Sequence, residues 1–119
     1  MGRRTAFASQ LDAGHDLLAG ALHDWFGLTD GEARILCVLY LARGHAREVA
    51  ELAAQAGSTP GAVRVHMAKI RKSLDCEAID CLPRGGGYVL TAGGAAECRD
   101  AIGSTIATLQ AFARGGLRQ

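Results

Sequence analysis

The chain has 119 residues, 49% of them apolar and 21% charged, with a formal net charge of +1. This length allows one domain with a hydrophobic core, and the composition is ordinary for a globular protein. The longest apolar run, Ile35 to Ala42, is far shorter than the roughly 20 residues that cross a bilayer, and the N-terminal residues lack the apolar stretch of a signal peptide, so we expect a cytoplasmic protein without membrane contact.

The N-terminal part of the chain predicts a flexible basic arm over residues 1–9 and a helix over residues 10–27. Gly27 is a typical residue at which such a helix ends. The apolar residues of the predicted helix recur at amphipathic spacing: Leu11, Leu18, Leu22, Trp25 and Phe26.

A capping pattern begins the next predicted helix. In Thr29-Asp30-Gly31-Glu32 the threonine hydroxyl and the glutamate carboxylate can each accept a hydrogen bond from the other residue's backbone amide, which is a capping box. The apolar residues from Ile35 to Leu41 then predict the buried central helix, closed by Arg43-Gly44. A shorter helix is predicted over residues 47–56.

A tight turn joins this short helix to the next one. Gly57 can take the left-handed conformation that ends a helix, and Ser58-Thr59 offers hydroxyls that cap the following helix. Pro60 fits the first helical position, where its missing N–H has no consequence. A helix, a glycine turn and a capped helix form the helix-turn-helix pattern.

The helix after this turn has two different faces. At about 100° per residue, one sector is apolar and predicts the core face; it contains Val63, Met67, Ile70 and Leu74. The opposite sector combines small or apolar residues with basic ones; it contains Gly61, Arg64, Val65, Ala68, Lys69 and Lys72.

The outward sector predicts contact with DNA, because residues 58–74 contain four basic side chains and no carboxylate. Arg64 and Lys69 can donate to guanine, and Val65 or Ala68 can touch a thymine methyl group. Arg71 and Lys72 suit phosphates, which position a protein without reading sequence. His66 lies at the border of the two faces, where we expect packing or one backbone hydrogen bond.

Residues 79–90 predict two short strands joined by a glycine turn that carries Arg84. The run Arg84-Gly85-Gly86-Gly87 lacks the Gly-Lys-Ser/Thr ending of a phosphate-binding loop and leads into a strand, where that loop requires a helix. A hairpin is the better interpretation, with glycines supplying positive φ and Tyr88 returning to the core. We expect Arg84 to contact the DNA backbone or minor groove.

Thr91-Ala92-Gly93-Gly94 predicts a break in the chain, and the region 92–119 predicts a last helix. Its apolar stripe contains Cys98, Ile102, Ile106, Leu109 and Phe112. The first and last helices together carry more apolar surface than a three-helix core can cover. We expect this surface to form a homodimer; the alternative is that the two helices pack against each other within one chain.

The four cysteines show no zinc-binding spacing; they are Cys37, Cys76, Cys81 and Cys98. We expect them to be reduced, small apolar residues, with a redox or metal role shared with His66 as the alternative. The scattered Asp, Glu and His residues show no nucleophile–base arrangement. The sequence therefore predicts no enzyme, no cofactor and no metal.

Three motifs resemble the winged-helix effector domain of the OmpR/PhoB family of response regulators. They are Leu28-Thr29-x-x-Glu32-x-x-x-Leu36, Val63-x-Val65-His66-Met67-x-x-Ile70-Arg71-Lys72-x-Leu74 and Arg84-Gly85-x-Gly87-Tyr88. The resemblance covers residues 28–91 and implies a recognition helix in the major groove, a hairpin wing on the backbone or minor groove, and RNA polymerase as a possible partner. The chain departs from the family in three ways: a helix precedes the domain in place of a four-stranded sheet, Gly57-Ser58-Thr59 replaces the longer loop that contacts polymerase, and Pro83 is an extra residue in the wing.

The sequence thus predicts a mainly α protein with a small β-hairpin, a winged helix-turn-helix over residues 28–91 with additional N- and C-terminal helices. We expect a transcriptional regulator that binds double-stranded DNA as a homodimer. The alternative is a winged-helix module that binds proteins and not DNA, such as an anti-activator or a phage-encoded modulator, which the near-neutral net charge favours. The predicted DNA-binding residues are Ser58, Thr59, Arg64, Val65, Ala68, Lys69, Arg71, Lys72 and Arg84.

Overall fold

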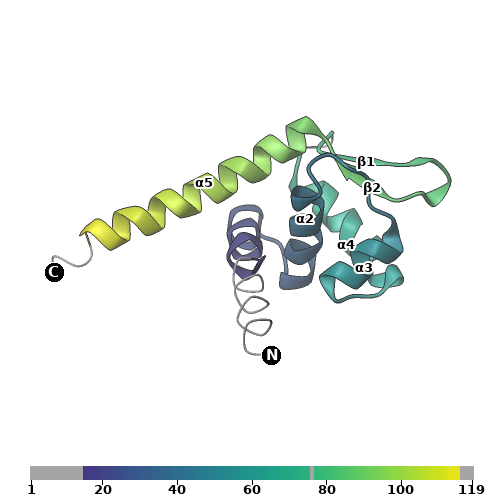
Figure 1. Cartoon of the computed structure of the whole chain (residues 1–119), viewed down its shortest axis with the longest axis horizontal. Coiled ribbons are helices and arrows are strands. Elements are labelled where there is room, and N and C mark those ends of the chain that lie inside the picture. The colour runs from purple at the N-terminus through teal and green to yellow at the C-terminus, as the bar shows by residue number, and fades with distance from the viewer. Residues whose placement is uncertain (1–14, 76, 116–119) are drawn as a thin grey trace, which may run out of the picture.

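A computed structural model describes residues 15–75 and 77–115 of the chain. The described chain is mainly helical, with one small antiparallel hairpin. Figure 1 shows a helical body from which the hairpin projects on one side and a long C-terminal helix on the other. The predicted arm at 1–9 and the first residues of the predicted helix at 10–27 lie outside the described residues, as do residues 116–119.

The first described helix spans residues 15–26 and ends at Gly27, whose φ is +67°. Helix α2 follows over Asp30–Leu41. The predicted capping box is confirmed: the Thr29 amide donates to Glu32 Oε1 at 2.9 Å, and Thr29 Oγ1 accepts from the Glu32 amide at 3.3 Å. The interior of α2 is almost wholly buried, which makes it the central helix of the body.

Helix α3 spans Val49–Ala56, so the predicted start at Arg47 is wrong by two residues. The backbone of Arg47 instead pairs with Tyr88 of the hairpin, with N···O distances of 2.9 and 3.0 Å in the two directions. The Arg47 carbonyl accepts from the Tyr88 amide in this bridge, whereas in a helix that began at Arg47 it would accept from the amide four residues on. Glu48 therefore becomes the N-cap residue, and its amide donates to Glu51 Oε1.

The turn between α3 and the next helix has the predicted chemistry. Gly57 adopts φ +67° and ends α3. Helix α4, Pro60–Ser73, begins with proline in its first turn and with Thr59 as its cap, whose hydroxyl accepts from the Ala62 amide at 3.2 Å. Helices α2, α3 and α4 all contact one another.

The hairpin consists of β1, Ile79–Cys81, and β2, Tyr88–Leu90, in antiparallel register. A tight turn, η1 (Pro83–Gly85), in which Arg84 has non-helical φ and ψ, fills the loop between them. Gly87 has φ +115°, and a Cβ atom there would lie 2.1 Å from the Arg47 carbonyl oxygen. Only glycine lets the hairpin approach the Arg47 backbone this closely.

Helix α5 spans Ala92–Gly115, so the predicted chain break at Gly93-Gly94 is wrong. Both glycines lie in the first turn of the helix, where Thr91 Oγ1 accepts from the Gly94 amide at 3.1 Å. A Cβ atom on Gly94 would lie 2.3 Å from the Ala78 carbonyl oxygen. The glycine therefore allows α5 to pack directly on the segment that enters β1.

One hydrophobic core joins these elements, and α5 reaches it only near its beginning. Cys98 and Ala101 of α5 belong to the same buried cluster as Leu22 of the first helix. Beyond Ile102 every apolar residue of α5 with a large side chain is exposed. No helix in the described ranges is both long and apolar enough to cross a membrane.

Candidate nucleic-acid interface

The inner face of α4 fixes the orientation of the whole helix. Val63, Met67 and Ile70 are completely or almost completely buried against the core, and Leu74 is buried just beyond the last turn. The predicted core face is therefore confirmed. Because a helix anchored along its length cannot rotate, its opposite face is fixed as well.

The outer face of α4 is exposed and basic, as predicted from its spacing. Val65 is 62% exposed, and Arg64, Ala68, Lys69 and Lys72 are exposed around it. The ion pairs of the described chain all involve residues other than these three cationic ones. The face therefore presents positive charge that no neighbouring carboxylate neutralises at short range.

The first turn of α4 brings Ser58 and Thr59 next to this face. The Thr59 hydroxyl is engaged as the helix cap, while the half-buried Ser58 donates its amide to the Ala53 carbonyl at 2.8 Å. Backbone amides at a helix N-terminus carry partial positive charge and bind phosphate readily. This end of α4 is thus chemically compatible with an anionic backbone.

Arg71 links the end of α4 to the hairpin. Its Nη1 atom donates to Cys81 Sγ on β1 at 2.9 Å, and both side chains are exposed. Spacing along one helix does not reveal such a contact, so the sequence prediction missed it. Of the cysteines in the described residues, Cys37 and Cys98 are buried and Cys81 is exposed, while Cys76 lies outside the described residues.

Arg84 lies at the exposed tip of the hairpin with a left-handed backbone, φ 60° and ψ 30°. For a residue other than glycine this conformation costs about 1–2 kcal/mol. The turn holds it in place, since the Gly86 amide donates to the Pro83 carbonyl at 3.1 Å. Within residues 15–75 and 77–115 no ion pair joins Arg84 to a carboxylate of the hairpin. The turn thus presents the guanidinium group to solvent.

A buried carboxylate lies behind the basic face beside a half-buried histidine, and the sequence did not predict this pair. Glu32 is 4% exposed, and its Oε2 atom lies 3.7 Å from Nδ1 of the half-buried His66. Burial acts to raise the pKa of the Glu32 carboxyl, but hydrogen bonding from Thr29 and the positive charges of Lys69 and His66 outweigh it and leave that pKa below its ordinary value. The carboxylate connects the start of α2 to the middle of α4.

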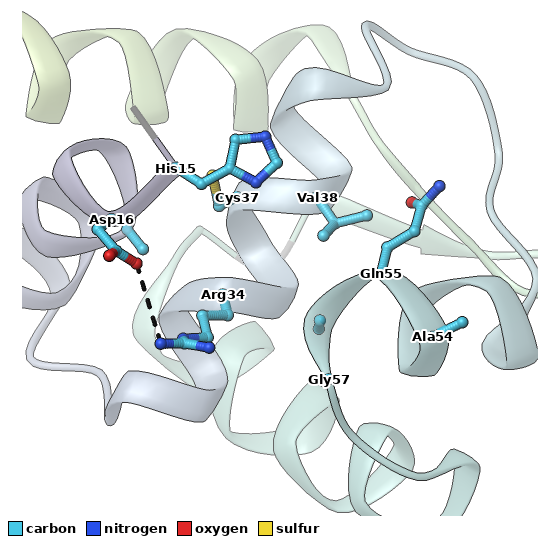
Figure 2. Close-up of a pocket in the computed structure, with 10 residues that line it drawn as sticks. His15, Asp16, Arg34, Cys37, Val38, Ala54, Gln55 and Gly57 are labelled. Carbon is cyan, nitrogen blue, oxygen red and sulfur yellow. Dashed lines mark ion pairs between the residues drawn. The ribbon is translucent and has the colours of Figure 1, made fainter. Parts of the chain in front are cut away.

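A cavity of about 410 Å³ lies elsewhere in the body, between helix 15–26 and the facing sides of α2 and α3 (Figure 2). Asp16 and Arg34 meet across its rim at 3.9 Å. Cys37 forms part of its wall, and burial raises the pKa of this thiol to about 11, so it is neutral and weakly nucleophilic at physiological pH. No group of residues in the described ranges has the composition and geometry to hold a metal ion.

Comparison of this chain with known protein families, with curated proteins and with solved structures found no match. The geometry and chemistry of the α4 face and the hairpin tip are therefore the basis for a functional conclusion.

Proposed function

We propose that this protein is a sequence-specific, DNA-binding transcriptional regulator built as a winged helix-turn-helix, with α4 as the recognition helix and the β1–β2 hairpin as the wing. The observation that carries the proposal is the outer face of α4. There, unneutralised cationic side chains surround an exposed strip of Gly61, Val65 and Ala68. Small and apolar side chains allow close approach to base edges, and apolar contact with a thymine methyl group is one of the ways in which a base is read.

In the proposed complex α4 enters the major groove. An α-helix with its side chains is about 10–12 Å wide, which fits a groove about 12 Å wide. Arg64 and Lys69 then donate to guanine acceptors, and Val65 or Ala68 contacts a thymine methyl group. Lys72 and Arg71 bind phosphates and set the register of the helix.

The hairpin provides a second contact in this proposal. Arg84 is held at the tip in an unfavourable backbone conformation, and such conformations gather where function requires them. A narrow A·T-rich minor groove attracts an arginine through its negative potential. The hydrogen bond between Arg71 and Cys81 connects the recognition helix to the wing, which supports a combined contact of the two elements with DNA.

A second candidate function is a winged-helix module that binds another protein and not DNA. The net charge of +1 favours it, since DNA-binding domains of this size are usually more basic. The two candidates differ in a simple property: phosphate contacts release counterions, and protein–protein contacts through an apolar surface do not.

The test is the affinity for random-sequence duplex DNA, measured by fluorescence anisotropy over a range of salt concentrations. We expect log affinity to fall with log salt at about −0.9 for each of about four to six phosphates contacted. Lys72→Ala should reduce the magnitude of that slope by about 1.

Arg99→Ala is the matched control, because Arg99 is an exposed arginine on α5 and not on α4. It should leave the slope unchanged. If the full chain binds no duplex at low salt, or binds it with an affinity that salt does not change, the protein-binding module replaces the DNA-binding proposal.

A further inference from the structure

The outer part of α5 has a surface that nothing in the described chain covers. We define the C-terminal stripe as Ile106, Leu109 and Phe112, which are 45%, 50% and 73% exposed. These residues follow Cys98 and Ile102 along one side of the helix, so the stripe continues the buried face past the point where the body ends. Figure 1 shows this part of α5 extending away from the body.

The composition of this part of the helix is unusual for a surface in water. Between residues 101 and 115 the only charged residue is Arg114, and the remainder are alanines, glycines, threonines and large apolar residues with one serine and one glutamine. Charged pairs at i, i+4 spacing, which stabilise exposed helices, are impossible in such a segment. An isolated helix of this length is marginal in water, and Gly103 weakens it further. The segment needs a packing partner to remain helical.

Helix 15–26 of the same chain does not supply that partner. It contributes Leu22 to the core beside Cys98 and Ala101, and it lies next to the inner part of α5 (Figure 1). Its own Leu17 and Trp25 are 53% and 52% exposed. Packing of the two terminal helices against each other within one chain therefore does not cover all of their apolar surface, because both helices keep exposed apolar side chains.

We propose that the C-terminal stripe pairs with the same stripe of a second copy of this chain, forming a two-fold symmetric homodimer. Self-pairing fits the chemistry because an apolar stripe without charges is complementary to itself and imposes no like-charge repulsion. A two-fold axis also places the same residues on both sides of the interface, which is the arrangement of most soluble oligomers.

The apolar area of the stripe fits a weak, reversible dimer. Aromatic side chains bury about 150–250 Å² each, so the exposed part of Phe112 amounts to roughly 150 Å². The half-exposed aliphatic side chains of Ile106 and Leu109 add roughly 100 Å². Two copies would then remove roughly 500 Å² of apolar surface, which corresponds to an interface below about 1,200 Å², the size range of weak and transient complexes.

An antiparallel pairing centred on Leu109 sets the distance between the two bodies. Cys98, where α5 leaves the core, is eleven residues before Leu109, and at about 1.5 Å per residue the two Cys98 positions lie about 33 Å apart. The dimer is inferred from apolar surface alone, so it does not depend on DNA binding.

The experiment is sedimentation of the full chain without DNA, at concentrations from about 1 to 100 µM. We expect a monomer–dimer equilibrium in this range. Leu109→Glu places a charge at the centre of the stripe and should weaken dimerisation by at least about 100-fold, because a buried charge without a partner is strongly unfavourable. Ala107→Glu is the matched control, since Ala107 is exposed on the opposite side of the same helix, and it should change the dimerisation constant by less than about 3-fold.

Thermal melting of both variants separates lost assembly from lost folding. Leu109 is outside the core, so both variants should keep the cooperative melting of the body. A wild-type chain that stays monomeric at 100 µM overturns the proposal, as does an equal effect of the two glutamate substitutions. A monomer in which Leu109→Glu lowers the melting temperature, and Ala107→Glu does not, overturns it in favour of coverage by residues 1–14 of the same chain. A chain that stays monomeric at 100 µM but binds DNA at low salt would refute the dimer and leave the proposed function intact.

Discussion

Helices α4 and α5 both pack on the core, but their exposed surfaces differ in chemistry. Each buries one face in the core, α4 through Val63, Met67 and Ile70 and α5 through Cys98 and Ala101. Their exposed surfaces have opposite chemistry: the outer face of α4 presents cationic side chains around small ones, whereas the outer half of α5 presents a nearly uncharged apolar stripe that continues its buried face. In both helices the buried residues fix the position of the helix in the fold, and the surface that stays exposed is the one available to a partner.

The two helices also differ in how they are supported. Helix α4 contacts both α2 and α3, whereas the contacts of α5 are made near its beginning, with β2 and the core. Removing a contact at the beginning of α5 should therefore affect the attachment of the whole helix, whereas changes on the outer face of α4 should affect binding alone.

The largest expected effect is on this attachment. In Gly94→Ala the new Cβ atom would meet the Ala78 carbonyl oxygen at 2.3 Å and Leu90 Cδ1 at 2.6 Å, and a backbone oxygen cannot move aside cheaply. We expect a loss of about 3 kcal/mol in the free energy of unfolding, in the range measured for overpacked sites. Urea denaturation followed by circular dichroism measures it.

Gly103→Ala is the control within the same helix, because a Cβ atom there has nothing within 4 Å. It should raise stability by up to about 1 kcal/mol, the difference in helix propensity between alanine and glycine. Equal destabilisation by both variants would show that α5 does not pack on the Ala78 segment as described.

The second prediction distinguishes base recognition from phosphate contact on the outer face of α4. If α4 is the recognition helix, Arg64→Ala should cost about 1–3 kcal/mol on a selected site and relax preference at one base position. Lys72→Ala should weaken selected and random sequences alike, because it removes a phosphate contact. Site selection from a random library followed by anisotropy on both DNAs provides the measurement. Equal losses of both variants on both DNAs would refute the base contact of Arg64.

Local chemistry accounts for the part of the structure that the sequence predicted well. The capping box at Thr29 and Glu32, the left-handed Gly57 and the α4 cap at Thr59 depend on residues within a few positions of each other. The 3.6-residue period also identified the buried face of α4. These features need no knowledge of distant segments, so their sequence patterns are sufficient.

The features that the sequence missed all depend on contacts between distant segments. Arg47 does not start α3 because its backbone pairs with that of Tyr88, which is distant in the sequence. Gly94 signals a close approach to Ala78 and not a chain break. Within the candidate site, the exposed basic residues of α4 were predicted, whereas the Arg71–Cys81 and Glu32–His66 contacts were not, because they join separate elements.

A third, smaller effect concerns the Glu32 carboxylate that connects α2 to α4. Its pKa is lower in the folded protein than the ordinary 4.5, so the ionised form adds stability that is fully present above about pH 4.5 and is lost as pH falls through the lowered value. Glu32→Gln keeps the shape of the cap but removes the charge, and it should cost about 1 kcal/mol at pH 7. That difference should shrink as pH falls below 4.5.

Melting curves of wild type and Glu32→Gln between pH 3 and 7 test whether the stability difference shrinks as pH falls. Glu51→Gln serves as the control, since Glu51 occupies the same cap position in α3 but is exposed. A stability difference for Glu32→Gln that stays constant over the whole pH range would refute the role of the charge.

The smallest expected effect, at the hairpin tip, distinguishes a DNA-binding residue from a structural one. Arg84 has a left-handed backbone, which costs a residue with a side chain about 1–2 kcal/mol, while glycine in its place loses about 0.5–1 kcal/mol more chain entropy on folding. Arg84→Gly should therefore stabilise the protein slightly, by about 0.5 kcal/mol, the difference between these two effects. Arg84→Ala retains the left-handed strain and should leave stability unchanged.

Both variants lack the guanidinium group and should weaken DNA binding to the same degree, most on sites with A·T-rich flanks. Melting temperature and affinity measured on the two variants decide the matter: unchanged affinity in both would mean that the hairpin does not touch DNA and that the basic face of α4 acts alone.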